Sequence, residues 1–566
     1  MSKKLFLILA MLALMPIALA NSGSMTLLTV GTSGNQTFGG TADLYLEIAP
    51  GSGRIFIDSF PLTQLDTQIS TRYAKEIACN YSETDCDSID FFYTIRARSS
   101  LVGGPSAGAA MAILTISLIE GIELDPKTVM TGTINSGGLI GPVSGIEEKA
   151  IAARQRGFEN IVIPKWANAN ISVDDINIVE VSTIEEALSQ FTGIHHQRPF
   201  YELEIPQMYK DIMRGVATDL CDSTNQLLEQ NSLNNSRNNY DLALSALERG
   251  DYYSAASFCF TANAALRNSI NFDLSRDELV LKYEEISANL NQAIKETNAR
   301  QLNTISDLET YVIVKERLYE VDSLLENKNA SLSNLGYIEE RFLSAIAWSS
   351  FFDFESRDIM LDDVFLRDAC LTKIAEAEER INYFEFIFGV SSDSRSELES
   401  ARDLHSAEDF AFCIFKATKV KADTNSMILS GMVSSDLLSE LALEKLNLAY
   451  NFVASSKDFP ILAYSYLNYA TSLLESNPRS TIIFTEYAME FSNLDMYFPE
   501  SKKETFVFED YLKRNNEFVL GFIFGLLFGL LVVGYQFAKF KYENSTKKRD
   551  NKPRKISKRN PPRKKR

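Results

Sequence analysis

Hydrophobic and polar positions follow two different patterns along the 566-residue chain. Between residues 25 and 195, short runs rich in β-branched and aromatic residues alternate with glycine turns and helical stretches, which is typical of an α/β domain. The clearest of these runs are ADLYLEI, GRIFIDSF, DFFYTIRAR and NIVIPK. Between residues 206 and 515, glycine is scarce and apolar residues recur at three- and four-residue spacing, which predicts an all-α region.

Three stretches of this all-α region resemble one another weakly. They are SALERGDYYSAASFCFTANAAL, SARDLHSAEDFAFCIFKATKVKA and FPILAYSYLNYATSLLESN. Each is expected to form a helix, a short turn and a second helix, and such hairpins stack and often present a groove to partners. Their spacing is irregular, so the sequence predicts helical hairpins rather than a named repeat. A spacer bundle and a peptide-binding array both stay open.

The two ends of the chain carry further hydrophobic segments. Residues 1–20 combine two lysines, an apolar run and an Ala-x-Ala end, which is the anatomy of a secretory signal peptide. Residues 518–538 form a stretch of 21 residues without a formal charge, long enough for a transmembrane helix. Residues 539–566 hold 14 Lys and Arg against two acids, and short basic flanks stay in the cytoplasm. We therefore expect a single-pass cell-membrane protein with an extracytoplasmic N-terminal ectodomain and a cytoplasmic tail.

The charge distribution excludes one class of partner. The formal net charge is −19, and setting aside +2 for residues 1–20 and +12 for residues 539–566 leaves −33 for the remainder. An ectodomain this acidic repels phosphates, which argues against nucleic-acid binding. The basic tail either enforces the topology or contacts anionic lipid headgroups, and both interpretations stay open.

The cysteines fall into pairs along the sequence. An even number of cysteines in a region expected to be exported indicates disulfides, and short loops close most readily. The expected pairs are Cys79–Cys86, Cys221–Cys259 and Cys370–Cys413. Buried free thiols are the alternative. The sequence contains no CxxC or HExxH motif, so we expect neither a metal site nor a cofactor.

A glycine-rich turn, GGPSAGAAMA at residues 103–112, places Ser106 before an apolar run. Taken alone, such a cluster is the ordinary start of a helix. A nucleophilic serine needs a general base. The histidines of the chain, His195, His196 and His405, lie outside the body of the α/β domain, which disfavours a Ser-His-Asp triad.

Lysine can replace histidine as the base when burial lowers its pKa. Lys149 stands 43 positions after Ser106, and Thr131 precedes the lysine by 18. Lys149 falls at the start of an apolar-periodic helix in GPVSGIEEKAIAA. An EEK sequence at a helix start is otherwise a common solvated turn, so the candidacy of Lys149 depends on its spacing from the serine.

GGPSAGAAMA, followed by MTGTI and GPVSGIEEKAIAA, resembles the proteolytic domain of the Lon protease family. The resemblance covers residues 25–195. The expected order of signal peptide, Lon-like domain, helical region and membrane anchor is similar to that of predicted membrane-anchored archaeal Lon-like serine proteases. It implies an α/β proteolytic fold with Ser106 as nucleophile, Lys149 as base and Thr131 orienting the lysine. Backbone N–H groups of the turn, at Gly104 and Ser106, are candidates for the oxyanion hole. Because members of the family form rings, the resemblance also implies a homo-oligomer.

Two features depart from that family. Many bacterial members carry an aspartate three positions before the serine, where this chain has Gly103. Lon proteases are fused to an ATP-driven unfoldase, and this sequence contains no GxxxxGK[ST] loop. Asp43, Glu47 and Asp66 are further acidic candidates for polar support, although no spacing argument places them in the site.

The sequence thus predicts a signal peptide (1–20), a Lon-like proteolytic domain (25–195), a helical domain (206–515), a transmembrane helix (518–538) and a basic tail (539–566). The function we expect is that of a membrane-anchored, ATP-independent serine endopeptidase. A Ser-Lys dyad would cleave unfolded or extended polypeptides outside the cytoplasm. Two alternatives stay open: a catalytically degenerate Lon-like domain that serves as a scaffold for a helical protein-binding module, and a glycine-rich anion-binding loop at Ser106.

Overall fold

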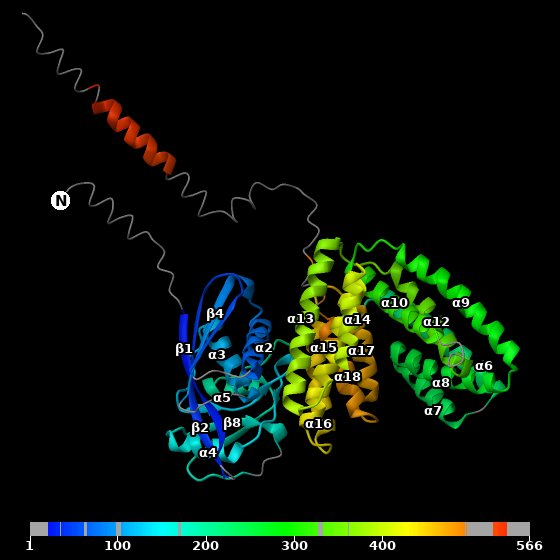
Figure 1. Ribbon diagram of the computed structural model, residues 1–566, viewed down its shortest axis with the longest axis horizontal. Coiled ribbons are helices and arrows are strands. Elements are labelled where there is room, and N and C mark those ends of the chain that lie inside the picture. Colours follow the sequence, from blue (N-terminus) through cyan, green and yellow to red (C-terminus); the bar gives the residue numbers. More distant parts are fainter. Residues whose placement is uncertain are drawn as a thin grey trace, which may run out of the picture. The chain divides into compact units, whose positions relative to one another are not determined.

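An α/β part and a long series of helices follow one another along the chain (Figure 1). The computed structural model describes residues 21–33, 36–60, 65–97, 104–167, 171–231, 233–326, 332–359, 361–492, 494, 498, 525–539 and 541. The signal peptide predicted for residues 1–20 lies outside the described residues. The described residues 525–539 and 541 belong to a unit separate from the rest of the chain.

A seven-stranded mixed sheet is the framework of the α/β part, in the order β3-β4-β2-β1-β5-β8-β9. Its strands are β1 (Asn21–Ser33), β2 (Gln36–Pro50), β3 (Ile55–Phe60), β4 (Ile89–Ala97), β5 (Thr128–Met130), β8 (Asn160–Pro164) and β9 (Asn177–Val181). β1 pairs antiparallel with β2 along its whole length, whereas β1, β5, β8 and β9 pair in parallel. A separate two-stranded sheet holds β6 (Thr133–Ile134) and β7 (Ile140–Gly141).

Helices cover both faces of this sheet. The α-helices are α2 (Leu65–Tyr81), α3 (Gly108–Glu120), α4 (Ile146–Gln155) and α5 (Ile184–Thr192), and the 3-10 helices are η1 (Cys86–Ser88), η2 (Pro105–Ala107), η3 (Ser136–Gly138) and η4 (Lys165–Ala167). α2, α3 and α5 share one core with Leu27 of β1, and α4 shares another with the next residue, Leu28. Adjacent strand residues point to opposite faces, so the apolar run of β1 serves both cores.

The all-α part extends from residue 207 to residue 491. Its helices are α6 (Gln207–Gln230), α7 (Asn234–Arg249), α8 (Tyr252–Phe272), α9 (Arg276–Asn298), α10 (Ile305–Leu325), α12 (Leu335–Trp348), η5 (Ser349–Asp353), α13 (Asp363–Phe388), α14 (Ser394–Ser406), α15 (Phe410–Met432), α16 (Leu438–Ala454), α17 (Ile461–Leu473) and α18 (Pro478–Phe491). Two of the predicted hairpins are α7 with α8 and α14 with α15. The third predicted stretch contains α17 alone, because prolines precede α17 and begin α18.

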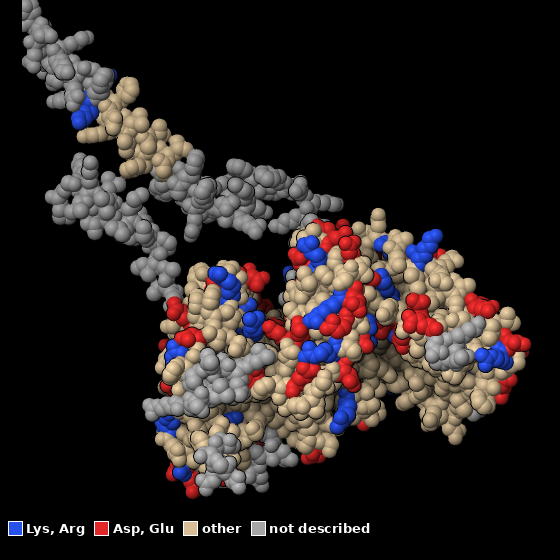
Figure 2. Space-filling model, viewed as in Figure 1, with Lys and Arg blue, Asp and Glu red and all other residues tan. Residues whose placement is uncertain are grey.

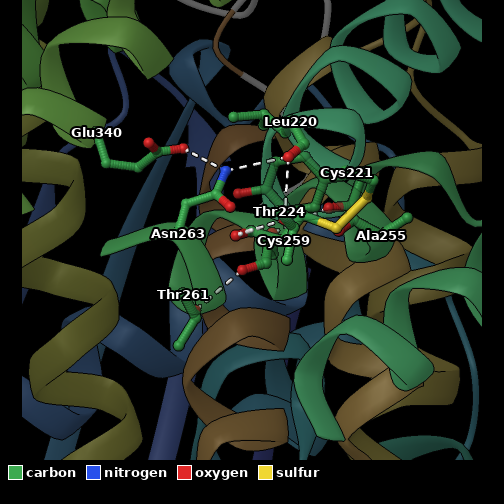
Figure 3. The surroundings of a disulfide bond; sticks show 10 residues. Leu220, Cys221, Thr224, Ala255, Cys259, Thr261, Asn263 and Glu340 are labelled. Atoms are coloured by element: carbon green, nitrogen blue, oxygen red, sulfur yellow. Dashed lines mark hydrogen bonds between the residues drawn. A yellow bond between two sulfur atoms is a disulfide. The ribbon is translucent and has the colours of Figure 1, made fainter. Parts of the chain in front are cut away.

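The three predicted disulfides are confirmed. They are Cys79–Cys86, Cys221–Cys259 and Cys370–Cys413, with Cα–Cα distances of 6.0, 5.2 and 5.6 Å. The first joins α2 to η1, and the other two join neighbouring helices of the all-α part. Figure 3 shows Cys221–Cys259 between α6 and α8, where Asn263 also donates to the Leu220 carbonyl oxygen at 3.0 Å. Disulfides of this kind persist in oxidising compartments.

Acidic and basic side chains are interleaved on the face of the all-α part that Figure 2 shows. Within the all-α part, Arg402 of α14 contacts the carboxylates of both Glu378 and Glu399, and Lys416 of α15 pairs with Glu397 of α14. On this face the excess of acidic residues in the sequence therefore does not gather into one acidic surface.

The predicted transmembrane helix at 518–538 is wrong for the part of the chain that the structure describes. Residues 518–524 lie outside the described residues, and the helix that is described covers 525–539. At 1.5 Å per residue it is about 22 Å long, less than the roughly 30 Å of a bilayer's hydrocarbon core. None of the described helices combines the length and apolar composition of a membrane span. Of the predicted basic tail, only residues 539 and 541 are described.

Candidate active site

Ser106 lies in η2, the turn that leads into α3. Gly104, which precedes this turn, has a φ of 105°, a conformation that favours glycine. Pro105 takes the first position, where its missing N–H leaves no donor unpaired. The carbonyl oxygen of Ser106 accepts hydrogen bonds from the Gly132 amide at 3.0 Å and the Thr131 hydroxyl at 3.2 Å. The turn is therefore fixed to the segment that follows β5.

Lys149 lies in the first turn of α4, on the opposite face of the sheet from α3. The helix starts after Gly145, whose φ is 66° and where an added Cβ would lie 2.5 Å from Val30 Cγ2. This close approach brings the start of α4 against β1 and buries Lys149 to 2% exposure. Its Nζ donates a hydrogen bond to Thr131 Oγ1 at 3.1 Å. Burial lowers the pKa of Lys149 to about 8, although the nearby Glu148 charge opposes the shift.

Thr131 joins the two other predicted residues. It directly follows β5, and its amide donates to the Val162 carbonyl oxygen of β8 at 3.0 Å. Its hydroxyl accepts from Lys149 and donates to the carbonyl oxygen of Ser106. The structure thus brings Ser106, Thr131 and Lys149 together at the carboxyl end of a central parallel strand, where helices from both faces meet.

A cavity of about 580 Å³ opens beside these residues, and both Ser106 and Lys149 line it. This volume lies within the range of ordinary ligand pockets. His195, His196 and His405 are all described and are not among the lining residues. His196 instead contacts the Thr192 hydroxyl at 3.0 Å. The described residues that line the cavity therefore offer serine hydroxyls and the amine of Lys149, without an imidazole.

Asp66, one of the three acidic candidates for polar support, holds the serine turn. Its Oδ2 accepts the Gly104 N–H at 2.5 Å, and its Oδ1 accepts the Thr67 N–H at 2.7 Å. Burial raises the pKa of Asp66, while these backbone hydrogen bonds oppose the shift. A carboxylate thus reaches the turn from the start of α2. The only signal in the sequence is an acidic residue at the start of a helix, which is too common to identify a site.

This contact bears on the two candidate oxyanion donors. The Gly104 N–H is engaged by Asp66, so of the two candidates the Ser106 N–H is the one that remains. The other two acidic candidates do not line the cavity. Asp43 lies 3.8 Å from Arg156 in a half-exposed pair, and Glu47 is exposed on β2.

The all-α part also borders the cavity. Phe386 and Ile387 at the end of α13, Met432 at the end of α15, and Ser434 line it together with the α/β residues. No feature of the sequence indicates this, because the two sets of residues are more than 200 positions apart.

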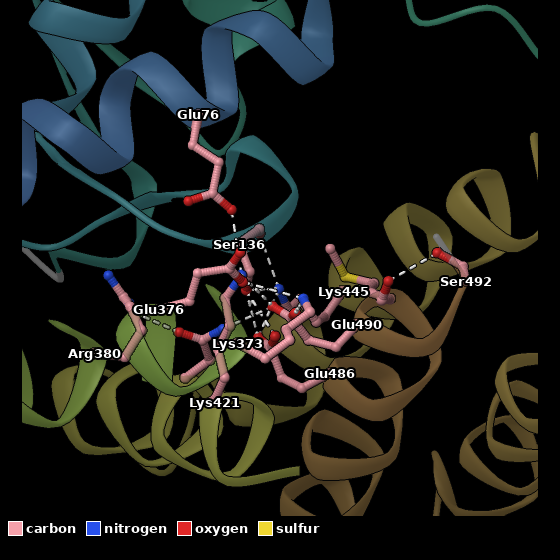
Figure 4. Close-up of polar contacts among 12 residues, drawn as sticks. Glu76, Ser136, Lys373, Glu376, Arg380, Lys421, Lys445, Glu486, Glu490 and Ser492 are labelled. Atoms are coloured by element: carbon pink, nitrogen blue, oxygen red, sulfur yellow. Dashed lines mark hydrogen bonds and ion pairs between the residues drawn. The ribbon is translucent and has the colours of Figure 1, made fainter. Parts of the chain in front are cut away.

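A buried polar cluster joins the two parts near the same place (Figure 4). Ser136 of η3 donates its hydroxyl to Glu486 of α18 at 2.6 Å, and Lys445 of α16 donates to the Ser136 carbonyl oxygen at 2.9 Å. The Lys445–Glu486 ion pair is 2.7 Å long, with both side chains fully buried. Because η3 follows the segment of Thr131 and Thr133, this cluster fixes the all-α part to the surroundings of the cavity.

Comparison with known proteins identifies relatives of the α/β part. Residues 88–191 match the family model of the Lon protease (S16) C-terminal proteolytic domain. The Lon protease of Methanosarcina barkeri is 30% identical over 166 residues, which cover 28% of this chain and 21% of that protein. Lon protease 2 of Bacillus subtilis is 36% identical over 104 residues, which cover 18% of this chain and 19% of that protein.

An archaeal Lon protease of Archaeoglobus fulgidus is 33% identical over 113 residues, which cover 19% of this chain and 18% of that protein. The chain therefore spans about a fifth of the length of these relatives. The predicted resemblance to the Lon proteolytic domain is confirmed, and it supports a serine protease. The matched residues 88–191 include Ser106, Thr131 and Lys149 and end before the all-α part.

Proposed function

We propose that the protein is an ATP-independent serine endopeptidase that cleaves unfolded or extended polypeptides outside the cytoplasm. The observation that carries this proposal is the environment of Lys149. Its amine is buried, hydrogen-bonded to Thr131, and lines the same cavity as Ser106. A lysine with a pKa of about 8 is neutral in a useful fraction at mildly alkaline pH and accepts a proton there.

In this mechanism, the neutral amine of Lys149 takes the proton from the Ser106 hydroxyl as the oxygen attacks a peptide carbonyl. The tetrahedral oxyanion accepts a hydrogen bond from the Ser106 N–H at the start of α3. Lys149 then gives its proton to the leaving amine, and water hydrolyses the acyl-enzyme by the reverse sequence. Between catalytic cycles, Thr131 holds the Lys149 amine in position through the hydrogen bond at 3.1 Å.

The location and the independence of ATP are parts of the same proposal. Three disulfides support a compartment that is oxidising, and ATP is scarce outside the cell. The sequence also lacks a GxxxxGK[ST] loop. Without an unfoldase in the chain, a substrate must reach the cavity already extended.

A serine-reactive probe on the purified protein separates this function from the scaffold alternative. We expect the probe to label the wild type at Ser106, to spare Ser106→Ala, and to label Lys149→Ala at a rate reduced at least about 100-fold, the scale of lost general base catalysis. Ser144→Ala is the matched control, because Ser144 is an exposed serine of the same cavity. Equal labelling of the wild type and of Ser106→Ala would support the scaffold instead.

A further inference from the structure

We propose that the all-α part supplies an apolar substrate subsite beside Ser106, formed by Phe386, Ile387 and Met432. These three residues are called the helical wall below. The subsite selects polypeptides that present a large aromatic or aliphatic side chain next to the cleaved bond. This inference rests on the proposed function and identifies the substrate class of that same site.

The helical wall and the reactive groups face one cavity. Ser106 and Lys149 line it from the α/β part, and the helical wall lines it from α13 and α15. A substrate whose carbonyl reaches Ser106 therefore brings its neighbouring side chains against the wall. Family likeness does not account for the wall, because the matched residues end at 191.

The chemistry of the cavity favours an apolar occupant. Among the described residues that line it, Lys149 is the only one with a charged side chain, and it is already buried against Thr131. Leu28, Val30 and Val143 add apolar surface on the α/β side. Acidic and basic substrate side chains thus have no ionic partner free for them in the cavity, and their desolvation would oppose binding.

Phe386 has surface left to bury. Its side chain is 46% exposed although it lies at the end of a packed helix, and it borders the open cavity. An apolar substrate group placed against it removes water from both surfaces, which is favourable in proportion to the apolar area covered.

The same element supports both the wall and the serine turn. At its first turn, α2 carries Asp66, which holds Gly104, and Thr67, which lines the cavity. One turn further, Ile69 of α2 packs in a buried cluster with Tyr383 and Ile428 of the all-α part, and Ile387 and Met432 of the wall pack against that cluster. The wall therefore has a fixed distance from Ser106, as a subsite requires.

Polar contacts between the α/β and all-α parts also hold this arrangement. Two residues of α2 contact the all-α part. Arg380 of α13 lies over the Tyr73 ring at 4.2 Å, and Glu76 pairs with Lys421 of α15 at 3.2 Å. Beyond Thr133, the Ser136–Lys445–Glu486 cluster joins η3 to α16 and α18 (Figure 4). These contacts between the two parts make a fixed wall the expected state of the protein.

The test is a set of fluorogenic peptides in which phenylalanine replaces alanine at one position at a time around the cleaved bond. We expect the wild type to show a higher kcat/KM for phenylalanine at one of these positions. Phe386→Ala and Met432→Ala should reduce that preference, the ratio of kcat/KM for the phenylalanine peptide to kcat/KM for the alanine peptide, by about tenfold, because one lost apolar contact has that scale. Phe386→Trp should lower kcat/KM for the phenylalanine peptide by crowding it.

The matched control is Leu371→Ala, on the same helix α13. Leu371 is 47% exposed, close to the 46% of Phe386, but it does not line the cavity. It should leave the preference unchanged. Because Phe386 and Leu371 are half-exposed, both variants should keep the wild-type melting temperature, and any variant that does not is set aside in favour of Phe386→Trp.

The two proposals fail in different ways. If peptides are cleaved and Ser106 is labelled, but the preference is absent or survives in all wall variants, the subsite is overturned and the protease stands. If the wall variants raise kcat/KM equally for every peptide, the wall is an obstruction, which also overturns the subsite. If no peptide is cleaved and Ser106 is not labelled, both proposals are overturned.

Discussion

Lys149 is the residue on which the proposed chemistry depends. The buried amine donates to one hydroxyl, that of Thr131, and the cost of its desolvation lowers its pKa more than the nearby Glu148 charge raises it. The resemblance to the Lon proteolytic domain implied roles for Ser106, Thr131 and Lys149, which the fold brings together and whose catalytic roles stay a prediction. Asp66 was not predictable in the same way, since only the folded sheet brings the start of α2 to the turn.

The first prediction concerns pH. A protonated lysine cannot act as a base, so kcat/KM should rise with pH and level off above about 8, the pKa of Lys149. Initial rates of peptide hydrolysis between pH 6 and 10 measure this. A plateau already complete at pH 7 would point to a histidine or carboxylate base instead.

The second prediction concerns Asp66. Replacing its carboxylate by an amide in Asp66→Asn keeps the shape but weakens the bond to the Gly104 N–H, so the serine turn should lose its position. We expect kcat to fall about tenfold or more, as for the loss of roughly 1.4 kcal/mol of transition-state stabilisation, with KM little changed. Asp43→Asn, at a half-exposed position away from the cavity, is the control and should behave as wild type.

At the level of elements, the four predicted runs fall in β2, β3, β4 and β8, whereas none of them covers β1. β3 and β8 coincide with the predicted runs GRIFIDSF and NIVIPK, because both are bounded by turn residues. β5, β6 and β7 were missed, since two or three residues carry no periodicity. The contact of α16 and α18 with η3 was also not predictable, because it joins positions more than 300 residues apart.

The third prediction tests that contact. Lys445→Met alone should lower the free energy of unfolding by about 3–5 kcal/mol, because it leaves Glu486 buried without its partner. The double variant Lys445→Met, Glu486→Leu should regain much of this loss. Lys127→Ala, which breaks an exposed pair with Glu159, is the control and should cost at most about 1 kcal/mol. Urea unfolding followed by circular dichroism gives the values, and equal losses in the single and double variants would contradict the account.

At the scale of the whole molecule, the proposed function depends on two features. They are the disulfides and the contact between the α/β and all-α parts. The cysteine pairs followed from sequence order and loop length alone. The predicted membrane span is wrong for the described residues, among which no helix is both long and apolar enough to cross a membrane. The sequence did not predict the cavity between the α/β and all-α parts, because the residues that line it from the two parts are more than 200 positions apart.

The fourth prediction ranks the disulfides. Removing Cys221–Cys259, which closes a separation of 38 residues, should cost about 4 kcal/mol in the double alanine variant. Removing Cys79–Cys86, with a separation of 7, should cost only about 2 kcal/mol, because a short loop loses less entropy on closure. Thermal melting of the two variants checks the order, and the reverse order would show that packing around the shorter loop dominates.

The most direct measurement for the central claim is hydrolysis of an unfolded casein by the purified protein without ATP. We predict cleavage by the wild type and by the double variant His195→Ala, His196→Ala. Ser106→Ala and Lys149→Ala should both abolish cleavage to a similar extent, because groups that act as one unit are not additive, and Thr131→Ala should reduce it less. Full activity of the serine and lysine variants, with loss in the histidine variant, would contradict the Ser-Lys mechanism.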